Sequence, residues 1–382
     1  MIYKQTLGHK ISMLGMGAMR LPPVDPDEPR GAIDRERAIK LIRDAYESGV
    51  NYFDTAYVYG GGESERILGE ALSIYPRDTY YVATKFPGLH PPVGGWTKEK
   101  VAATFAEQLE KLGMDYVDFY LLHGIMESDY DIYTDPSLEL PEYFVEMKKQ
   151  GRIRHFGFSS HSTPPTLKKI LEWKDCFEFV QIQLNYLDWT LQHAKEQYEM
   201  IAEHGLAMII MEPVRGGKLA HLSDGLESEM RAMRPSDSTA AWAFRYLKTL
   251  PNVNIVLSGM TYPDQLADNL KTFSDDEALT DEQVKFLYDK VVPSLAEMVP
   301  CTACRYCCEG CPKHLDIPAL ISIYNEIKMD GRSFRVMGLK PEELPSNCVG
   351  CGKCMKVCPQ AIKIPEIMKD MAARIDAMRQ GR

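Results

Sequence analysis

The sequence has few of the features that mark exported, membrane-spanning or nucleic-acid-binding chains. Its 382 residues contain no run of 18 apolar residues, and the start, Met1–Gln5, has no apolar signal segment. The formal net charge is −10, so a basic surface that would neutralise phosphates is not expected. We therefore predict a cytoplasmic protein whose partners are neither nucleic acid nor a membrane.

Before residue 300 the chain contains a single cysteine, Cys176. The other nine cysteines lie between Cys301 and Cys358. Clustered cysteines in a chain without an export signal favour metal binding over disulfides, because the cytoplasm is reducing. The short cysteine-rich part is therefore expected to bind metal.

Two runs of cysteines share the spacing C-x2-C-x2-C-x3-C-P. In the ferredoxin pattern, three cysteines of such a run bind one [4Fe-4S] cluster and the fourth binds the other cluster. Zinc fits the spacing less well, because it prefers paired C-x2-C units. One predicted cluster is held by Cys301, Cys304, Cys307 and Cys358, and the other by Cys348, Cys351, Cys354 and Cys311. The alternative is that each run binds its own cluster.

This part of the chain resembles the dicluster ferredoxin domain over about residues 296–382. The segment between the two runs, Pro312–Asn347, is longer than in a minimal ferredoxin and includes a predicted helix around Ala319–Met329. In this respect it resembles the helical dicluster domains of multi-subunit redox enzymes.

Short β-rich runs alternate with amphipathic helical runs from Met1 to about Thr280. Asp34 and Thr97 are suited to cap the helices Arg35–Ser48 and Lys98–Leu112. Eight strand–helix units in succession predict a (β/α)8 TIM barrel, an α/β fold. The predicted strands are Met13–Ala18, Asn51–Thr55, Tyr80–Lys85, Tyr116–His123, Ile153–Ser159, Val180–Asn185, Ala207–Glu212 and Ile255–Gly259.

The competing fold is a doubly wound sheet, which normally opens with G-x-G-x-x-G, and Gly15-Met16-Gly17 does not continue that motif. The predicted domains are the barrel over residues 1–280, a connecting helix over 281–298, and a small, mainly helical dicluster ferredoxin-like domain over 299–382.

Polar side chains end three successive predicted strands of the barrel. Residues Asp54–Gly60 read D-T-A-Y-V-Y-G, Lys85 ends the next strand, and His123 ends the one after it in L-L-H. These motifs, in this order, resemble the aldo-keto reductase family over about residues 1–275. The resemblance implies a catalytic tetrad of Asp54, Tyr59, Lys85 and His123.

This tetrad suits the reduction of a carbonyl by hydride. The developing alkoxide needs a proton, and Tyr59 would donate it as general acid. The Lys85 ammonium is expected to lower the pKa of Tyr59, and Asp54 to keep Lys85 charged and in place. Taken singly, each residue also has a structural explanation: a buried salt bridge, a core aromatic ring or a hydrogen-bonded histidine.

The same resemblance implies a site for NADP or NAD. Ser159 and Gln181 would contact the nicotinamide carboxamide, Ser160 stands where the family has Asn, and Met211 replaces a stacking tyrosine. Gly259 and Asn269 match the adenine end, while Gln265 replaces the arginine that binds the 2′-phosphate, which leaves the choice between NADP and NAD open. Independently of the resemblance, two cations and two glycines in one loop suit a phosphate: Arg215, Gly216, Gly217 and Lys218. The alternative is an ordinary solvated loop.

We predict a nicotinamide-dependent oxidoreductase that acts on a small carbonyl or alcohol. A hydride carries two electrons and each cluster passes one, so coupling the two parts needs a flavin or a substrate that accepts single electrons. No flavin motif is present. Otherwise the clusters serve structure or the docking of a redox partner protein. The alternative function is an electron-transfer or partner-docking module whose barrel is a non-catalytic scaffold.

Overall fold

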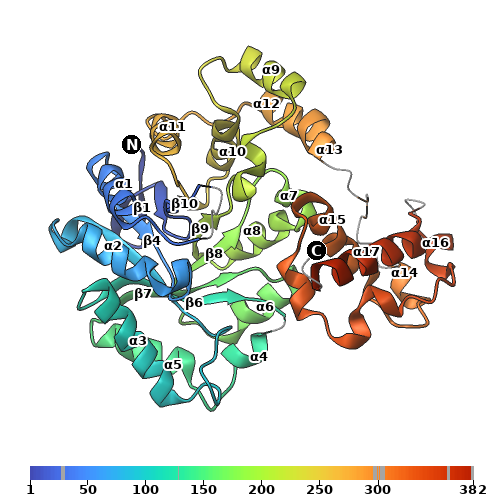
Figure 1. The fold of residues 1–382 in the computed structure, drawn as a ribbon, viewed down its shortest axis with the longest axis horizontal. Coiled ribbons are helices and arrows are strands. Elements are labelled where there is room, and N and C mark those ends of the chain that lie inside the picture. The colour runs from blue at the N-terminus through green and yellow to red at the C-terminus, as the bar shows by residue number, and fades with distance from the viewer. Residues whose placement is uncertain are drawn as a thin grey trace. The chain divides into compact units, whose positions relative to one another are not determined.

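The computed structural model describes residues 1–26, 31–127, 129–295, 299, 301, 306–358 and 362–379. The chain divides into two compact units, Met1–Val284 and Lys285–Arg382. Figure 1 shows the elements of both, coloured from blue at the N-terminus to red at the C-terminus. Each unit is described by itself below.

Eight parallel strands close into a barrel in the first unit, which confirms the predicted (β/α)8 fold. The strands pair in chain order, and the last pairs with the first. Each lies within two residues of its predicted bounds at either end. They are β3 (Leu14–Gly17), β4 (Tyr52–Asp54), β5 (Tyr81–Phe86), β6 (Val117–Ile125), β7 (Ile153–Ser160), β8 (Phe179–Gln183), β9 (Ala207–Met211) and β10 (Val253–Ser258).

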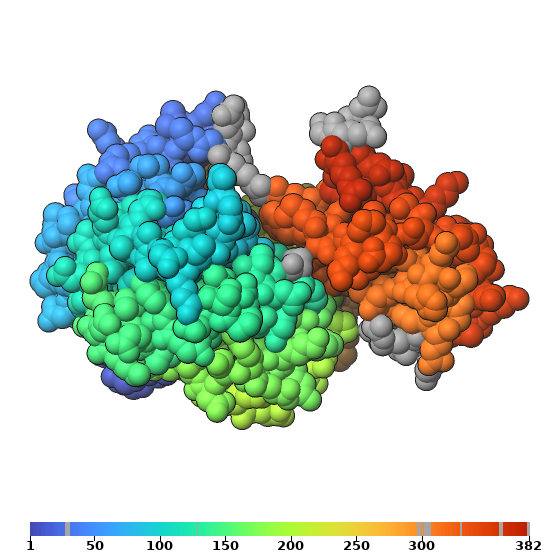
Figure 2. Space-filling view, turned by 90° about the horizontal axis from the view of Figure 1, so that it is seen from below, coloured from blue at the N-terminus to red at the C-terminus, as the bar shows by residue number. Residues whose placement is uncertain are grey.

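Helices follow the strands, and those of the first half form one continuous outer surface, coloured blue to green in Figure 2. Both predicted caps are present: Asp34 accepts a hydrogen bond from the Arg37 N–H and Thr97 from the Lys100 N–H. The helices of this unit are α1 (Arg35–Glu47), α2 (Ser64–Leu72), α3 (Lys98–Leu112), α4 (Tyr130–Tyr133), α5 (Leu140–Lys149), α6 (Pro164–Trp173), α7 (Asp188–Leu191), α8 (Ala194–Glu203), α9 (Asp224–Met233), α10 (Thr239–Lys248) and α11 (Pro263–Thr272).

A hairpin that the sequence analysis missed covers the N-terminal ends of the barrel strands. Its strands, β1 (Tyr3–Thr6) and β2 (His9–Ser12), pair antiparallel. Ile11 is fully buried among inward-facing side chains that include Tyr52 and Phe179. The hairpin therefore closes this end of the barrel, and the C-terminal ends of the strands remain for a site.

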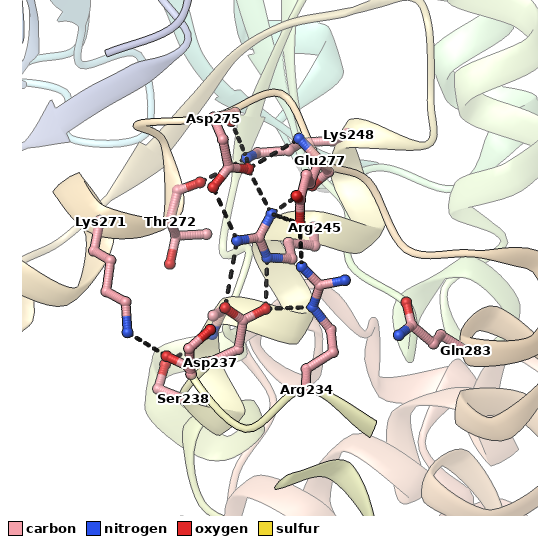
Figure 3. A network of polar contacts seen from close by, with 12 residues as sticks. Arg234, Asp237, Ser238, Arg245, Lys248, Lys271, Thr272, Asp275, Glu277 and Gln283 are labelled. Atoms are coloured by element: carbon pink, nitrogen blue, oxygen red, sulfur yellow. Dashed lines mark hydrogen bonds and ion pairs between the residues drawn. The ribbon is translucent and has the colours of Figure 1, made fainter. Parts of the chain in front are cut away.

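A network of ion pairs fixes α10 to the segments on either side of it (Figure 3). The Arg245 side chain, only 4% exposed, donates to Asp237 at 2.6 Å and to Asp275 at 2.7 Å. Arg234 donates to Asp237 at 2.5 Å, and Lys248 donates to the Asp275 carbonyl oxygen at 2.7 Å. The network thereby connects α10 to the segment before it, at Asp237, and to the segment after α11, at Asp275.

The second unit is small and mainly helical, as predicted. A predicted connecting helix is interrupted by a π-turn at Leu287–Val291, which separates α12 (Asp281–Phe286) from α13 (Val292–Leu295). Further on lie α14 (Tyr306–Glu309), α15 (Ile317–Asp330), α16 (Lys353–Lys356) and α17 (Ile364–Arg379). The core lies between α15 and α17 and includes Leu320, Ile327, Met368 and Met371. None of the helices in the described ranges is long and apolar enough to cross a bilayer.

We expect Arg245→Met to lower the free energy of unfolding by about 2–3 kcal/mol, because it leaves the buried Asp237 with Arg234 alone. Arg231→Met is the matched control, since Arg231 is 69% exposed and lies 4.0 Å from Glu227. The control should change stability by less than about 0.5 kcal/mol. Urea unfolding of both variants measures the difference, and equal midpoints would show that the network adds nothing.

Candidate functional site

Lys85 and Asp54 form a buried ion pair at the C-terminal ends of β5 and β4. The Lys85 Nζ donates to Asp54 Oδ1 and to the Thr55 carbonyl oxygen, each at 2.6 Å. Burial lowers the pKa of Lys85 and raises the pKa of Asp54, while the attraction between the two charges opposes both shifts. The lysine is therefore held in one place by two short hydrogen bonds.

Tyr59 and His123 lie beside this pair. The Lys85 Nζ is 5.0 Å from the centroid of the Tyr59 ring, and the Tyr59 and His123 ring centroids are 5.6 Å apart at an interplanar angle of 78°. Both rings are partly exposed, whereas Lys85 and Asp54 are buried. The structure thus brings all four predicted tetrad residues together at the end of the barrel opposite the hairpin.

The pKa of Tyr59 differs from the expectation drawn from the sequence. Although the ring is partly exposed, desolvation of the phenol raises the pKa of Tyr59 well above 10, and the negative charges of Asp54 and Glu212 raise it further. Lys85 faces the ring of the tyrosine, so its charge does not reverse this shift. Burial, Lys85 and the neighbouring histidines, His161 and His90, lower the pKa of His123 well below 6.5. At neutral pH, Tyr59 is protonated and His123 is neutral.

Glu65, a buried glutamate on α2, is hydrogen-bonded to β5, the strand that carries Lys85. Glu65 Oε1 accepts from Thr84 Oγ1 at 2.6 Å and from Gln108 Nε2 at 2.9 Å, and Gln108 Nε2 also donates to the Lys85 carbonyl oxygen at 3.0 Å. Sequence reasoning missed Glu65. Its signal was a charge on the apolar face of α2, in helical register with Leu68 and Leu72, both fully buried.

The residues expected at the nicotinamide lie on adjacent strands. Ser159 Oγ accepts from the Gly124 N–H at 2.6 Å, and Gln181 Nε2 donates to the Met211 sulfur at 3.6 Å. Gln181 Oε1 is buried and has no hydrogen-bond partner in the described part of the chain. The Ser160 hydroxyl instead lies 2.7 Å from Ser162 Oγ and 3.2 Å from the Ile125 carbonyl oxygen, so it is engaged within the protein.

The residues expected at the phosphates and the adenine lie in the turn after β9, in the loop after β10 and in α11. Gly217 has φ +98° in the turn Arg215–Ala220, which also carries the half-buried Lys218. Arg215 is buried, and its Nε lies 3.1 Å from both carboxylate oxygens of Asp188. Gly259 is exposed after β10. In α11, Gln265 Oε1 accepts from the Thr261 N–H at 2.7 Å, and Asn269 donates to Ser258 at 2.8 Å.

Four cysteines of the second unit line one pocket: Cys311, Cys348, Cys351 and Cys354. This is the set expected if the fourth cysteine of the first run serves the second cluster. Cys301, Cys307 and Cys358 contribute to or border the hydrophobic core of this unit, and Cys304 lies outside the described residues. Within the described ranges, no three His, Cys, Asp or Glu side chains converge on a single ion. A cube-shaped cluster does not need this, since each thiolate binds a different iron.

A family model described as "Aldo/keto reductase family" matches residues 13–291, which include all eight barrel strands. The chain belongs to the aldo/keto reductase family. A second model, described as "4Fe-4S dicluster domain", matches residues 300–362. Both matches confirm the resemblances drawn from the motifs.

Among aldo/keto reductases, the chain is similar to the uncharacterized oxidoreductase YqkF of Bacillus subtilis, at 26% identity over 72% of this chain and 92% of that protein. It is also 26% identical to the NADH-specific methylglyoxal reductase of Escherichia coli, over 63% of this chain and 83% of that one. The structure of the aldo-keto reductase AKR11C1 from Bacillus halodurans aligns with a TM-score of 0.60 and 28% identity, covering 76% of this chain and 96% of that one.

We expect Cys311→Ser and Cys348→Ser to perturb the same cluster in anaerobically purified protein, because both residues line one pocket. Each variant should lose up to about four of roughly eight irons and leave the same residual spectrum of reduced cluster. Cys301→Ser should leave the complementary spectrum. Cys308→Ser, adjacent to a ligand but outside the repeat, is the control and should keep all the iron. If Cys311→Ser matched Cys301→Ser instead, each run would bind its own cluster.

Proposed function

We propose that the protein is a nicotinamide-dependent oxidoreductase that reduces the carbonyl of a small molecule, with Tyr59 as general acid. The observation that carries this proposal is the convergence of Asp54, Tyr59, Lys85 and His123 within one end of the barrel. A scaffold would gain nothing from burying a charged lysine beside a partly exposed tyrosine, since such pairs cost desolvation free energy.

The residues present fit a nicotinamide. The carboxamide NH2 would donate to the buried Gln181 Oε1, which otherwise lacks a partner among the described residues. Ser159 already accepts from the Gly124 N–H, so its own proton is available to the carboxamide oxygen. Met211, in contact with Gln181, would lie against the ring as a polarizable sulfur. A nicotinamide bound there supplies hydride.

The chain's own groups then handle the substrate oxygen. Tyr59 holds a proton that burial keeps on the phenol at neutral pH, and it releases that proton to the oxygen as negative charge develops there. Neutral His123 donates a hydrogen bond to the same oxygen and orients the carbonyl. Lys85, fixed by Asp54, stabilises the negative charge that Tyr59 acquires. In the reverse direction the same groups accept a proton from an alcohol.

We further propose that the enzyme has no strict requirement for NADP. Position 265 carries a glutamine whose side-chain oxygen caps α11, so this position offers no cation to a 2′-phosphate. A related Escherichia coli protein is named as NADH-specific, which agrees with a site lacking that charge. Lys271 lies on the same helix, but its ammonium group donates to the Ser236 carbonyl oxygen.

The dicluster domain is proposed to hold two [4Fe-4S] clusters that exchange single electrons with a redox partner protein in the cytoplasm. The pocket lined by Cys311, Cys348, Cys351 and Cys354 supports one of these sites. Cys351 is exposed, so the cluster would lie close to the surface of the unit, where a partner can reach it.

We expect Tyr59→Phe to lower kcat for aldehyde reduction by at least about 100-fold, because the variant has no proton to give. The Kd of NADH, measured by titration, should stay within about twofold. Tyr57→Phe is the matched control: Tyr57 is two residues away and bonds Glu107 at 3.0 Å, so kcat should be retained. A Tyr59→Phe enzyme with wild-type turnover would disprove the role. A wild-type protein that bound no nicotinamide nucleotide would favour the scaffold.

We expect kcat for reduction to remain level from about pH 7 to about pH 9. Tyr59 is active as an acid below its folded-state pKa, which lies well above 10, and His123 is neutral above its own, which lies well below 6.5. Neither group changes protonation within that window. A pH profile of kcat in a single mixed buffer checks this, and an inflection near pH 8 would contradict it.

A further inference from the structure

Arg20, in the segment after β3, contacts the loops that follow the two neighbouring strands, β10 and β9. Its backbone oxygen accepts from Thr261 Oγ1 at 2.9 Å, which fixes it to the loop after β10. A Cβ atom placed on Gly259 would lie 3.8 Å from the Arg20 Cβ, in ordinary contact. The stem of Arg20 therefore lies against the loop expected to receive the adenine end of a nucleotide.

The guanidinium group of Arg20 reaches a second loop, the glycine turn after β9. A Cβ atom placed on Gly216 would lie 3.1 Å from Nη2 and 3.3 Å from Nη1 of Arg20. Gly216 also has φ +67°, a conformation that other residues rarely adopt. The turn therefore favours glycine at position 216, and the Arg20 guanidinium lies directly beside it.

Glu212 occupies the space between these donors. Its carboxylate is 3.7 Å from Arg20 Nη2, and it also accepts a hydrogen bond from the Gly216 backbone. Glu212 has φ +54°, an uncommon conformation for a residue other than glycine, and such strain concentrates at functional sites. A guanidinium group and a backbone N–H of a glycine turn are the donors that proteins use to bind phosphate.

We propose that Arg20 is the main cationic contact for the diphosphate of the nucleotide, and that Glu212 fills this anion position until the nucleotide binds. The inference rests on the proposed function. Arg215, in the same turn, is buried against Asp188, whereas the Arg20 side chain is 40% exposed and within reach of a ligand. On binding, Arg20 exchanges a carboxylate of the protein for a phosphate of the ligand.

Substitutions of Arg20 and of Glu212 are therefore expected to change ligand affinity in opposite directions. Arg20→Met keeps the apolar stem and should weaken NADH and ADP-ribose by about 10- to 100-fold, the range for a charged hydrogen bond. Arg20→Lys keeps the charge without the two-pronged geometry and should fall between wild type and Arg20→Met. Glu212→Gln should tighten both ligands, because the competing carboxylate is gone, and this gain should vanish when Arg20→Met is also present.

Isothermal titration of the full chain tests this with NADH, ADP-ribose and adenosine, which has no phosphate. Adenosine affinity should not change in any variant. Arg66→Met is the matched control, since Arg66 is 47% exposed and lies 3.8 Å from Glu63, and it should bind like wild type.

Two results would overturn the inference while leaving the proposed function intact. One is unchanged ADP-ribose affinity in both Arg20 variants, each shown to be folded by its urea midpoint. The other is a rise confined to the KM of a carboxylate-bearing carbonyl substrate, which would make Arg20 a substrate contact. A wild-type protein that binds neither NADH nor ADP-ribose would remove the proposed function and this inference together.

Discussion

The buried ion pair between Lys85 and Asp54 is the constraint on which the rest of the barrel site depends. Two charges with almost no exposure to water are stable only when their geometry is well fixed, because desolvation opposes them. The fixing comes from the barrel itself: β4 and β5 are neighbours in parallel register, with Asp54 opposite Ala83. Tyr59 lies in the turn after β4, and His123 lies near the end of β6, the neighbour of β5 on its other side.

The need to fix this ion pair also accounts for the buried hydrogen-bonded side chains around the backbone of Lys85. Glu65, Thr84, Gln108 and Tyr120 form a chain of hydrogen bonds that ends on the Lys85 carbonyl oxygen. A site whose charged groups are held before the substrate arrives does not have to reorganise during the reaction. Through Glu65 and Gln108, the helices α2 and α3 thus hold in place the strand that carries Lys85.

Much of the barrel could be read from the sequence, because strands buried on both faces and helices with clear caps leave strong periodic patterns. The tetrad was found because its residues lie at, or a few residues beyond, the ends of three successive predicted strands. Other features depend on contacts between distant segments. Arg20 meets Glu212 only after the barrel has closed, and the raised pKa of Tyr59 comes from burial, which motifs do not reveal. The hairpin Tyr3–Ser12 was missed because its sequence is mostly polar and only one of its buried residues, Ile11, is apolar.

The hairpin also decides from which side a ligand can approach the barrel site. With the N-terminal end closed around Ile11, everything that reaches Lys85 and Tyr59 must enter and leave through the opposite end. Gln181 is almost fully buried there, so a nicotinamide that reaches it occupies the innermost position. A molecule bound against Gln181 would therefore have to enter before, and leave after, one bound only against the partly exposed Tyr59.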